Sequence, residues 1–218
     1  MAVYLPNGSI VAIASGYGSP FNVSAVTNAD PAVATATAHG LADGDYIDFV
    51  SGWARATDRI FRVDGGTTDT FELEDFDSTS ISLYPSGGGA GTARRITGWT
   101  QLAQILDSSS VGGEQNYWTG QFLEGDREIR IPTTKSAAGI DFQIADDPGQ
   151  PGYQLAKQAN DDRDPRAVRI TLANGGILLY KAYISLSVIP SLTVNEAMTL
   201  GVSLSQHGDP IRYSGPQA

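Results

Sequence analysis

The sequence of 218 residues contains no cysteine, which excludes disulfide bonds and thiolate metal sites. It also lacks any run approaching the roughly 20 apolar residues of a membrane-spanning helix. No basic segment followed by an apolar run marks a secretory signal near the N-terminus. We therefore expect a soluble protein that does not use the usual secretory signal and has no membrane partner.

Basic residues are few and scattered. The chain has 14 Lys and Arg against 24 Asp and Glu, a formal net charge of −10, and no basic run longer than the pair Arg94 and Arg95. A protein that grips nucleic acid neutralises phosphates with clustered Lys and Arg. This composition therefore disfavours tight DNA binding.

The acidic excess is concentrated in one part of the chain. Residues 22–93 carry 11 acidic and three basic residues, a net charge of −8, and the remaining residues are nearly balanced. Glycine-rich breakers flank this stretch at residues 16–20 and 86–91. The sequence thus predicts two units: a main domain of residues 1–20 and 94–218, and an inserted small β module of residues 21–93.

Long helical patterns are absent, and the 25 glycines suit short strands joined by turns. In the insert, short apolar or alternating runs predict strands at residues 32–37, 46–50, 59–63 and 70–74. Such a unit of roughly 70 residues is a small barrel or sandwich.

The main domain shows the same alternation with one helical exception. Residues 153–159, preceded by Pro151, predict a short helix. Asn174 and Gly175 lie between two alternating runs and predict a hairpin turn. We expect Ile129 and Ile131 to face a core. The predicted strands are residues 127–131, 139–144, 167–172, 177–188 and 194–205. The fold class is thus mainly β, a sandwich or barrel with one short α-helix plus the inserted all-β module.

Residues suited to chemistry do not form a constellation. His39 and His207 stand apart without paired carboxylates, and the glycines of residues 87–91 lack the Lys and Ser or Thr of a phosphate loop. The neighbouring carboxylates Glu124, Asp126 and Glu128 are more typical of a charged surface than of an acid–base pair. We expect no enzyme activity, no metal and no cofactor.

Three stretches of the C-terminal half stand out, namely residues 166–175, 179–187 and 194–204, and residues 208–210 follow them. Together they resemble the closing half of lambda-type siphophage tail tube proteins. Upstream, residues 117–120, 139–144 and 148–149 stand in the order that this family has. The insert is similar to a small β module that recurs in phage tail and baseplate proteins, and we expect it on the outside of a tube.

The resemblance implies a structural subunit of a non-contractile phage tail tube. Its copies would form stacked, hexameric rings around a channel for DNA and the tape measure protein, with tail terminator and baseplate proteins as further partners. Assembly would take place in the host bacterial cytoplasm, and the product would be part of the virion. The family also implies that a loop contacts the next ring, which points to Ser108, Ser109, Ser110, Glu114, Gln115 and Asn116.

The channel wall needs side chains that do not hold DNA, and acidic or small polar residues meet that need because they leave phosphates unneutralised. Candidates for the lumen are Glu128, Asp141, Gln143, Thr199, Ser203 and Ser205.

Two other functions compete with the tube subunit. One is a phage baseplate or adhesin subunit whose carbohydrate-binding β module uses Trp53 as a surface for stacking on sugars. The other is a secreted glycan hydrolase, which rests only on the paired carboxylates and the all-β pattern.

Overall fold

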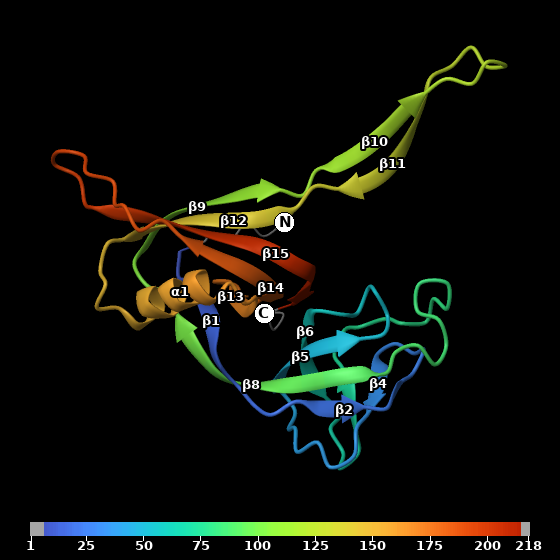
Figure 1. The fold of residues 1–218 in the computed structure, drawn as a ribbon. Helices are drawn as coiled ribbons and strands as arrows, with labels where there is room; N and C mark the ends of the chain where they lie inside the picture. Colours follow the sequence, from blue (N-terminus) through green and yellow to red (C-terminus); the bar gives the residue numbers. More distant parts are fainter. Residues whose placement is uncertain (1–6, 215–218) are drawn as a thin grey trace.

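The computed structural model describes residues 7–214, so the predicted positions 1–6 and 215–218 lie outside the described residues. The chain is mainly β, with one helix among the described residues, and the predicted fold class is confirmed (Figure 1). The insert contains β2 (Phe21–Val23), β3 (Ala25–Val26), β4 (Ala32–Thr35), β5 (Tyr46–Ser51), β6 (Arg59–Asp64) and β7 (Thr70–Leu73). The main domain contains β1 (Ile10–Tyr17), β9 (Ile105–Gly112), β10 (Gln115–Gly120), β11 (Ile129–Lys135), β12 (Ala138–Ala145), α1 (Pro151–Asp162), β13 (Arg166–Thr171), β14 (Ile177–Leu186) and β15 (Thr199–Tyr213). Strand β8 (Gly91–Gln101) belongs to both parts.

The strands join into one long antiparallel sheet that curls into a half-barrel (Figure 1). Its order is β3-β4-β7-β6-β5-β8-β1-β13-β14-β15-β12-β9, with β2 paired to β8 beside this path. Strands β10 and β11 form a separate two-stranded hairpin that projects away from the sheet. Consecutive positions of a strand point to opposite faces, so the sheet separates two hydrophobic cores.

The first core fills the insert. Four strands stand where the sequence predicts them, as β4, β5, β6 and β7. Phe49, Phe61 and Phe71 are fully buried, and Trp53 packs edge-to-face against Tyr84 with ring centroids 5.3 Å apart. This core continues into the main domain through four buried residues of β13, β14 and β15, namely Ala167, Leu179, Ile211 and Tyr213.

Strand β8 links the insert to the main domain. Its first half pairs with β5, where Asp48 lies opposite Arg94, and its second half pairs with β1, where Ala14 lies opposite Trp99. The predicted boundary between residues 93 and 94 therefore falls inside a continuous strand. Because one continuous strand pairs with both parts, it restricts how far they can move independently.

The second core lies on the opposite face of the main-domain sheet, under helix α1. The helix begins at Pro151 as expected, and it buries Leu155, Ala156 and Ala159. Its start lies directly on the end of β8, because a Cβ on Gly152 would be 2.3 Å from the carbonyl oxygen of Gln101. Because Gly152 has no side chain, the first turn of the helix can pack directly against the end of β8 and cover this core.

The hairpin prediction is confirmed. Strands β13 and β14 pair from Arg166–Ala182 to Thr171–Ile177, and Gly175 takes the positive φ of 81° that the turn requires. Strand β14 alternates as predicted up to its end at Leu186. Its second-core face carries Leu178, Tyr180, Ala182, Ile184 and Leu186.

Two strand predictions are wrong. The last strand begins at Thr199 and runs to Tyr213, so the residues from Val194 onward lie in a loop and the strand is longer than expected. Ile129 and Ile131 do not face a core: they are 38% and 49% exposed on β11. An alternating pattern gives two faces but does not say that either one is covered within the same chain.

Candidate functional site

A polar face covers the side of the sheet opposite the second core, across β9, β12, β15 and β14. The register aligns Ser109, Asp141, Ser203 and Ser185 in one row across the four strands. The next row contains Asp107, Gln143 and Gly201. These two rows line a shallow groove of ≈620 Å³, which also borders on Ser187.

The polar face is acidic and otherwise small and neutral. Asp107 and Asp141 are its carboxylates, and the Ser203 hydroxyl donates a 2.6 Å hydrogen bond to Asp141 Oδ1. No Lys or Arg is among the described residues that line the groove. This surface offers no cation that could hold a phosphate.

The structure brings most of the predicted lumen residues together. Asp141, Gln143 and Ser203 line the groove, and Thr199 and Ser205 lie on the same face of β15, because they are two or four residues from Ser203. Glu128 does not join them. It lies just before β11 in the projecting hairpin, where the whole segment is exposed.

The segment predicted as a flexible inter-ring loop is mostly strand, and the loop prediction is wrong. Ser108, Ser109 and Ser110 belong to β9, while Gln115 and Asn116 open β10; Glu114 lies in the short connection. Serines and glycines favoured a loop in the sequence, but pairing with β12 over Ala138–Ile144 makes this segment extended. Whether these residues contact another ring stays a prediction.

Strand β9 is the edge of the sheet. Within residues 7–214 it pairs only with β12, so its outer row of backbone N–H and C=O groups has no strand partner. Seven of its eight residues are exposed, including Leu106. An open edge of this kind is a template for pairing with another chain.

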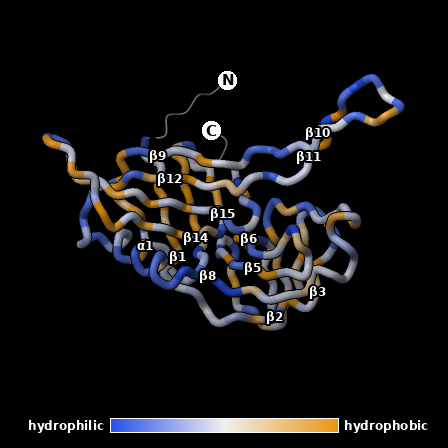
Figure 2. The backbone as a smooth tube through the Cα atoms, turned by 45° about the horizontal axis from the view of Figure 1, so that its top comes forward, coloured by the Kyte–Doolittle hydropathy of each residue, from blue (hydrophilic) through white to orange (hydrophobic). Residues whose placement is uncertain are grey.

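Two projections extend from opposite ends of the sheet (Figures 1 and 2), and both carry exposed apolar side chains. The first is the β10–β11 hairpin with its tip, where Leu123 is 99% exposed. The second is the loop between β14 and β15, where Ile189 and Val194 are more than 80% exposed. The hairpin also exposes Tyr117, Trp118, Phe122, Ile129 and Ile131; the loop also exposes Val188, Leu192 and Met198. The sequence did not identify either set as exposed, and for Ile129 and Ile131 it predicted a core position.

An isolated two-stranded hairpin is marginally stable in water. The β10–β11 hairpin has little internal packing to offset this, apart from Arg130 over the Tyr117 ring at 4.5 Å. Several exposed apolar side chains on such an arm are typical of a surface that another molecule covers.

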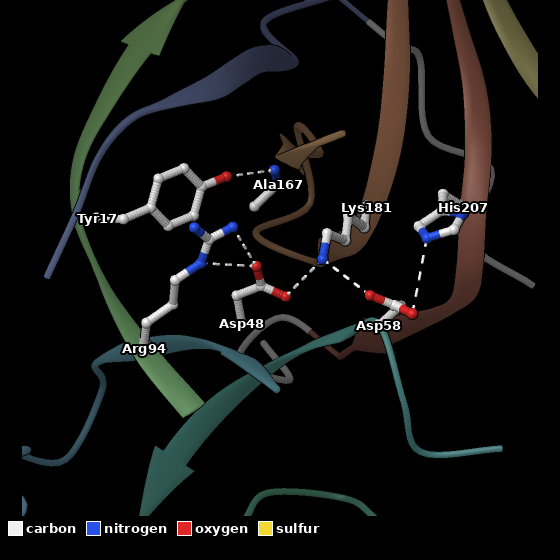
Figure 3. Close-up of polar contacts among 7 residues, drawn as sticks. All are labelled: Tyr17, Asp48, Asp58, Arg94, Ala167, Lys181 and His207. Carbon is white, nitrogen blue, oxygen red and sulfur yellow. Dashed lines mark hydrogen bonds and ion pairs between the residues drawn. The ribbon is translucent and has the colours of Figure 1, made fainter. Parts of the chain in front are cut away.

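A charge cluster around the buried pair Lys181 and Asp48 joins the insert to the main domain (Figure 3). Lys181 of β14, only 5% exposed, places its Nζ 3.2 Å from Asp48 Oδ1 and 2.9 Å from Asp58 Oδ1. Arg94 donates two hydrogen bonds to Asp48 Oδ2, at 3.0 Å and 2.7 Å. His207 Nε2 lies 3.6 Å from Asp58 Oδ2. We call Asp48, Asp58, Arg94, Lys181 and His207 the ion cluster.

Burial alone would lower the pKa of Lys181, but the charges and hydrogen bonds of Asp48 and Asp58 outweigh it and raise that pKa above its ordinary value. For tyrosine, whose charged form is the deprotonated one, burial has the opposite effect and raises the pKa values of Tyr17, Tyr180 and Tyr213. A raised pKa means that the folded state holds its proton more tightly than the unfolded state. The stability that such a group contributes is fully present below its ordinary pKa, and it is lost as the pH rises through the pKa that the group has in the folded state.

We therefore expect the free energy of unfolding to fall steeply above about pH 10, near the ordinary tyrosine and lysine values of 10.0 and 10.5. Urea unfolding between pH 8 and pH 11.5 measures this. The control is Tyr180→Phe, which removes a buried hydroxyl without a hydrogen-bond partner among the described residues. The variant should lose less stability at high pH, and a wild-type free energy that stays flat or rises from pH 9 to pH 11 would contradict the assignment.

Trp53 is not a surface residue, and its prediction as a sugar-stacking position is wrong. It is 2% exposed, and its indole N–H donates a 2.7 Å hydrogen bond to the carbonyl of Pro85. The adhesin hypothesis thereby loses the residue on which it depended.

The sequence also led to expectations about metal binding, membrane-spanning helices and the two histidines. Across residues 7–214, no group of three or more His, Cys, Asp or Glu side chains is placed to hold a metal ion. None of the helical segments in that range is long and apolar enough to span a membrane. His39 and His207 serve local contacts, to the Leu41 backbone N–H and to Asp58.

A family model described as phage tail tube protein (TTP) matches residues 51–215. Among solved structures, the chain is similar to one in the tail of an empty gene transfer agent particle with C6 symmetry, with 13% identity, 54% of this chain and 89% of that chain covered, and a TM-score of 0.44. It is also similar to a chain of the tube-terminating cap of the anti-feeding prophage and to one of an extracellular contractile injection system sheath-tube complex. Both have 18% identity, cover 49% of this chain and 79% of theirs, and give a TM-score of 0.37. No curated protein has a significantly matching sequence.

Proposed function

The chain belongs to the phage tail tube protein family, and from this premise we propose that it polymerises with copies of itself into the tube of a phage tail. The observation that carries the proposal is the combination of an open sheet edge at β9 with two apolar projections at opposite ends of the sheet. Each of these surfaces lacks a partner among the described residues. Other copies of the chain would supply these partners if they associate head-to-tail. In such a contact two different surfaces meet, so the contact can repeat from copy to copy and build a ring or a filament.

We further propose that the polar face lines the channel. Its rows of serine with Asp107 and Asp141 present acceptors and hydroxyls but no cation to a passing phosphate backbone. DNA and the tape measure protein would occupy this channel in turn. With the polar face inward, β9 and its neighbours would contribute strands to a barrel wall that several copies share.

The β9–β10 segment keeps its proposed inter-ring role in a modified form. Its residues now lead from the edge strand into the projecting hairpin, so the apolar hairpin makes the contact and the segment positions it. The loop between β14 and β15 projects from the other end of the same sheet and would meet the ring on that side.

The siphophage resemblance extends the proposal to a non-contractile tail whose rings contain six copies. Tail terminator and baseplate proteins would bind its ends, assembly would occur in the host bacterial cytoplasm, and the subunit would have no enzyme activity. The expected position of the insert on the outside of the tube remains part of this proposal.

Sedimentation velocity and negative-stain microscopy of the purified full chain test the proposal. We expect rings and rods that grow with protein concentration. A chain that stays monomeric at every concentration and salt condition would refute self-assembly.

A further inference from the structure

We propose that Lys181 is a positioning residue that fixes the orientation of the insert on the main domain, so that both move as one rigid body. The family assignment says only that the matched region, residues 51–215, reaches into the insert, and not which side chain sets its angle. The inference goes beyond the tube function and concerns how one subunit is built.

Lys181 lies where the insert meets the face of β14 that also carries the polar groove. Leu179 and Lys181 share this face and are covered by the insert, whereas Ser185, further along the same face, is exposed and lines the groove. Four residues of strand span about 13 Å. The insert therefore stands beside the groove, and a change in its angle would cover or uncover the end of the polar face.

Other contacts between the insert and the main domain surround the ion cluster. The Tyr213 hydroxyl accepts a 2.9 Å hydrogen bond from the backbone N–H of Arg62, whose guanidinium lies 4.6 Å from the Tyr213 ring centre. A Cβ on Gly208 would come within 2.2 Å of the carbonyl oxygen of Asp58, and Gly208 has a φ of +86°. Only glycine permits the two backbones to approach this closely without strain.

The charge asymmetry of the sequence has its structural counterpart here. Two acidic residues of the insert pair with cations from outside it: Asp48 with Arg94 and Lys181, and Asp45 with Arg95 at 2.8 Å. A buried ion pair adds little net stability over an apolar pair, because desolvation offsets the attraction, but its geometry allows few arrangements. The ion cluster therefore contributes orientation more than binding strength.

Pulsed electron–electron double resonance measures the distance between two spin labels, one on each part of the chain, and therefore reports this orientation directly. The chain has no cysteine, so Ser82→Cys in the insert and Gln158→Cys on α1, both exposed, give a single pair of nitroxide labels. Spin-labelled chains are diluted with unlabelled protein so that only the distance within one chain is recorded. We expect one narrow distance distribution for the otherwise unchanged full chain.

Lys181→Met should broaden or shift this distribution, because Asp48 and Asp58 lose the ammonium that holds them together, and Lys181→Arg should largely restore it. The matched control is Lys157→Met at an exposed position of α1, which should leave the distribution unchanged. Gly208→Ala, which separates the two backbones without altering any charge, should also shift it. A broad distribution in the parent chain would overturn the proposal even if Lys181→Met failed to fold. So would a folded Lys181→Met with a distribution as narrow as that of the parent.

Discussion

The double substitution Phe122→Asp and Leu123→Asp is expected to abolish tubes while the subunit stays folded. Both residues lie at the tip of the β10–β11 hairpin, 61% and 99% exposed, so the fold of the monomer does not depend on them. Burying two such side chains between copies is worth about 3–6 kcal/mol. Their loss should raise the concentration needed for assembly at least about 100-fold, since each 1.4 kcal/mol is about tenfold.

Sedimentation velocity across a concentration series measures this threshold, and circular dichroism monitors the fold. The control is Ile81→Asp with Leu83→Asp, which places the same two charges at apolar positions of the insert that are 67% and 44% exposed. It should assemble like the parent chain. Normal tubes from the Phe122 and Leu123 variant would show that the hairpin does not carry the contact.

Replacing Asp107 and Asp141 by lysine should give phages that assemble tails but eject DNA poorly. The change removes two negative charges and adds two positive ones, so the net charge of the polar face rises by four per subunit, at a place where no cation stands among the lining residues. Lysines that line a channel would neutralise phosphates and hold the DNA, and this effect multiplies over every copy in the tube. We expect infectivity to fall at least about tenfold, and more at low ionic strength, because phosphate contacts weaken with added salt.

The matched control for this variant is Asp161→Lys with Asp164→Lys, the same change in charge at exposed positions at the C-terminal end of α1 and just after it. Plaque titration and DNA release from purified virions compare the two. If both variants lost infectivity equally, net charge rather than the polar face would be responsible. Full infectivity of the Asp107 and Asp141 variant would show that this face does not line the channel.

Most strands, the hairpin turn and the helix start, which depend on a local sequence pattern, were predicted correctly. Alternation placed the strands of the insert, Asn174 and Gly175 located a hairpin, and Pro151 marked the first turn of α1. Each of these features depends on neighbours in the chain, so a short window contains the necessary information. The alternation of β12 and β15 also identified the residues of the polar face, because positions two apart share a face.

Features that depend on distant pairing were not predictable in the same way. Lys181 looked like one polar position on an alternating strand, and only the approach of β5 and the Asp58 turn makes it a buried ion-pair partner. Ile129 and Ile131 looked like core residues, since a surface that is covered only by another chain has the composition of a core. The segment from Ser108 to Ser110 looked like a loop, because serines and glycines are common in loops. Its pairing with β12 makes it a strand, and a single sequence does not reveal that pairing.

Cryo-electron microscopy of the assembled tubes tests the central claim most directly. The account predicts a map in which the row Ser109, Asp141, Ser203 and Ser185 faces the channel, with the hairpin and the β14–β15 loop buried between copies. A map with that row on the outer surface, or with both apolar projections free in solvent, would contradict it.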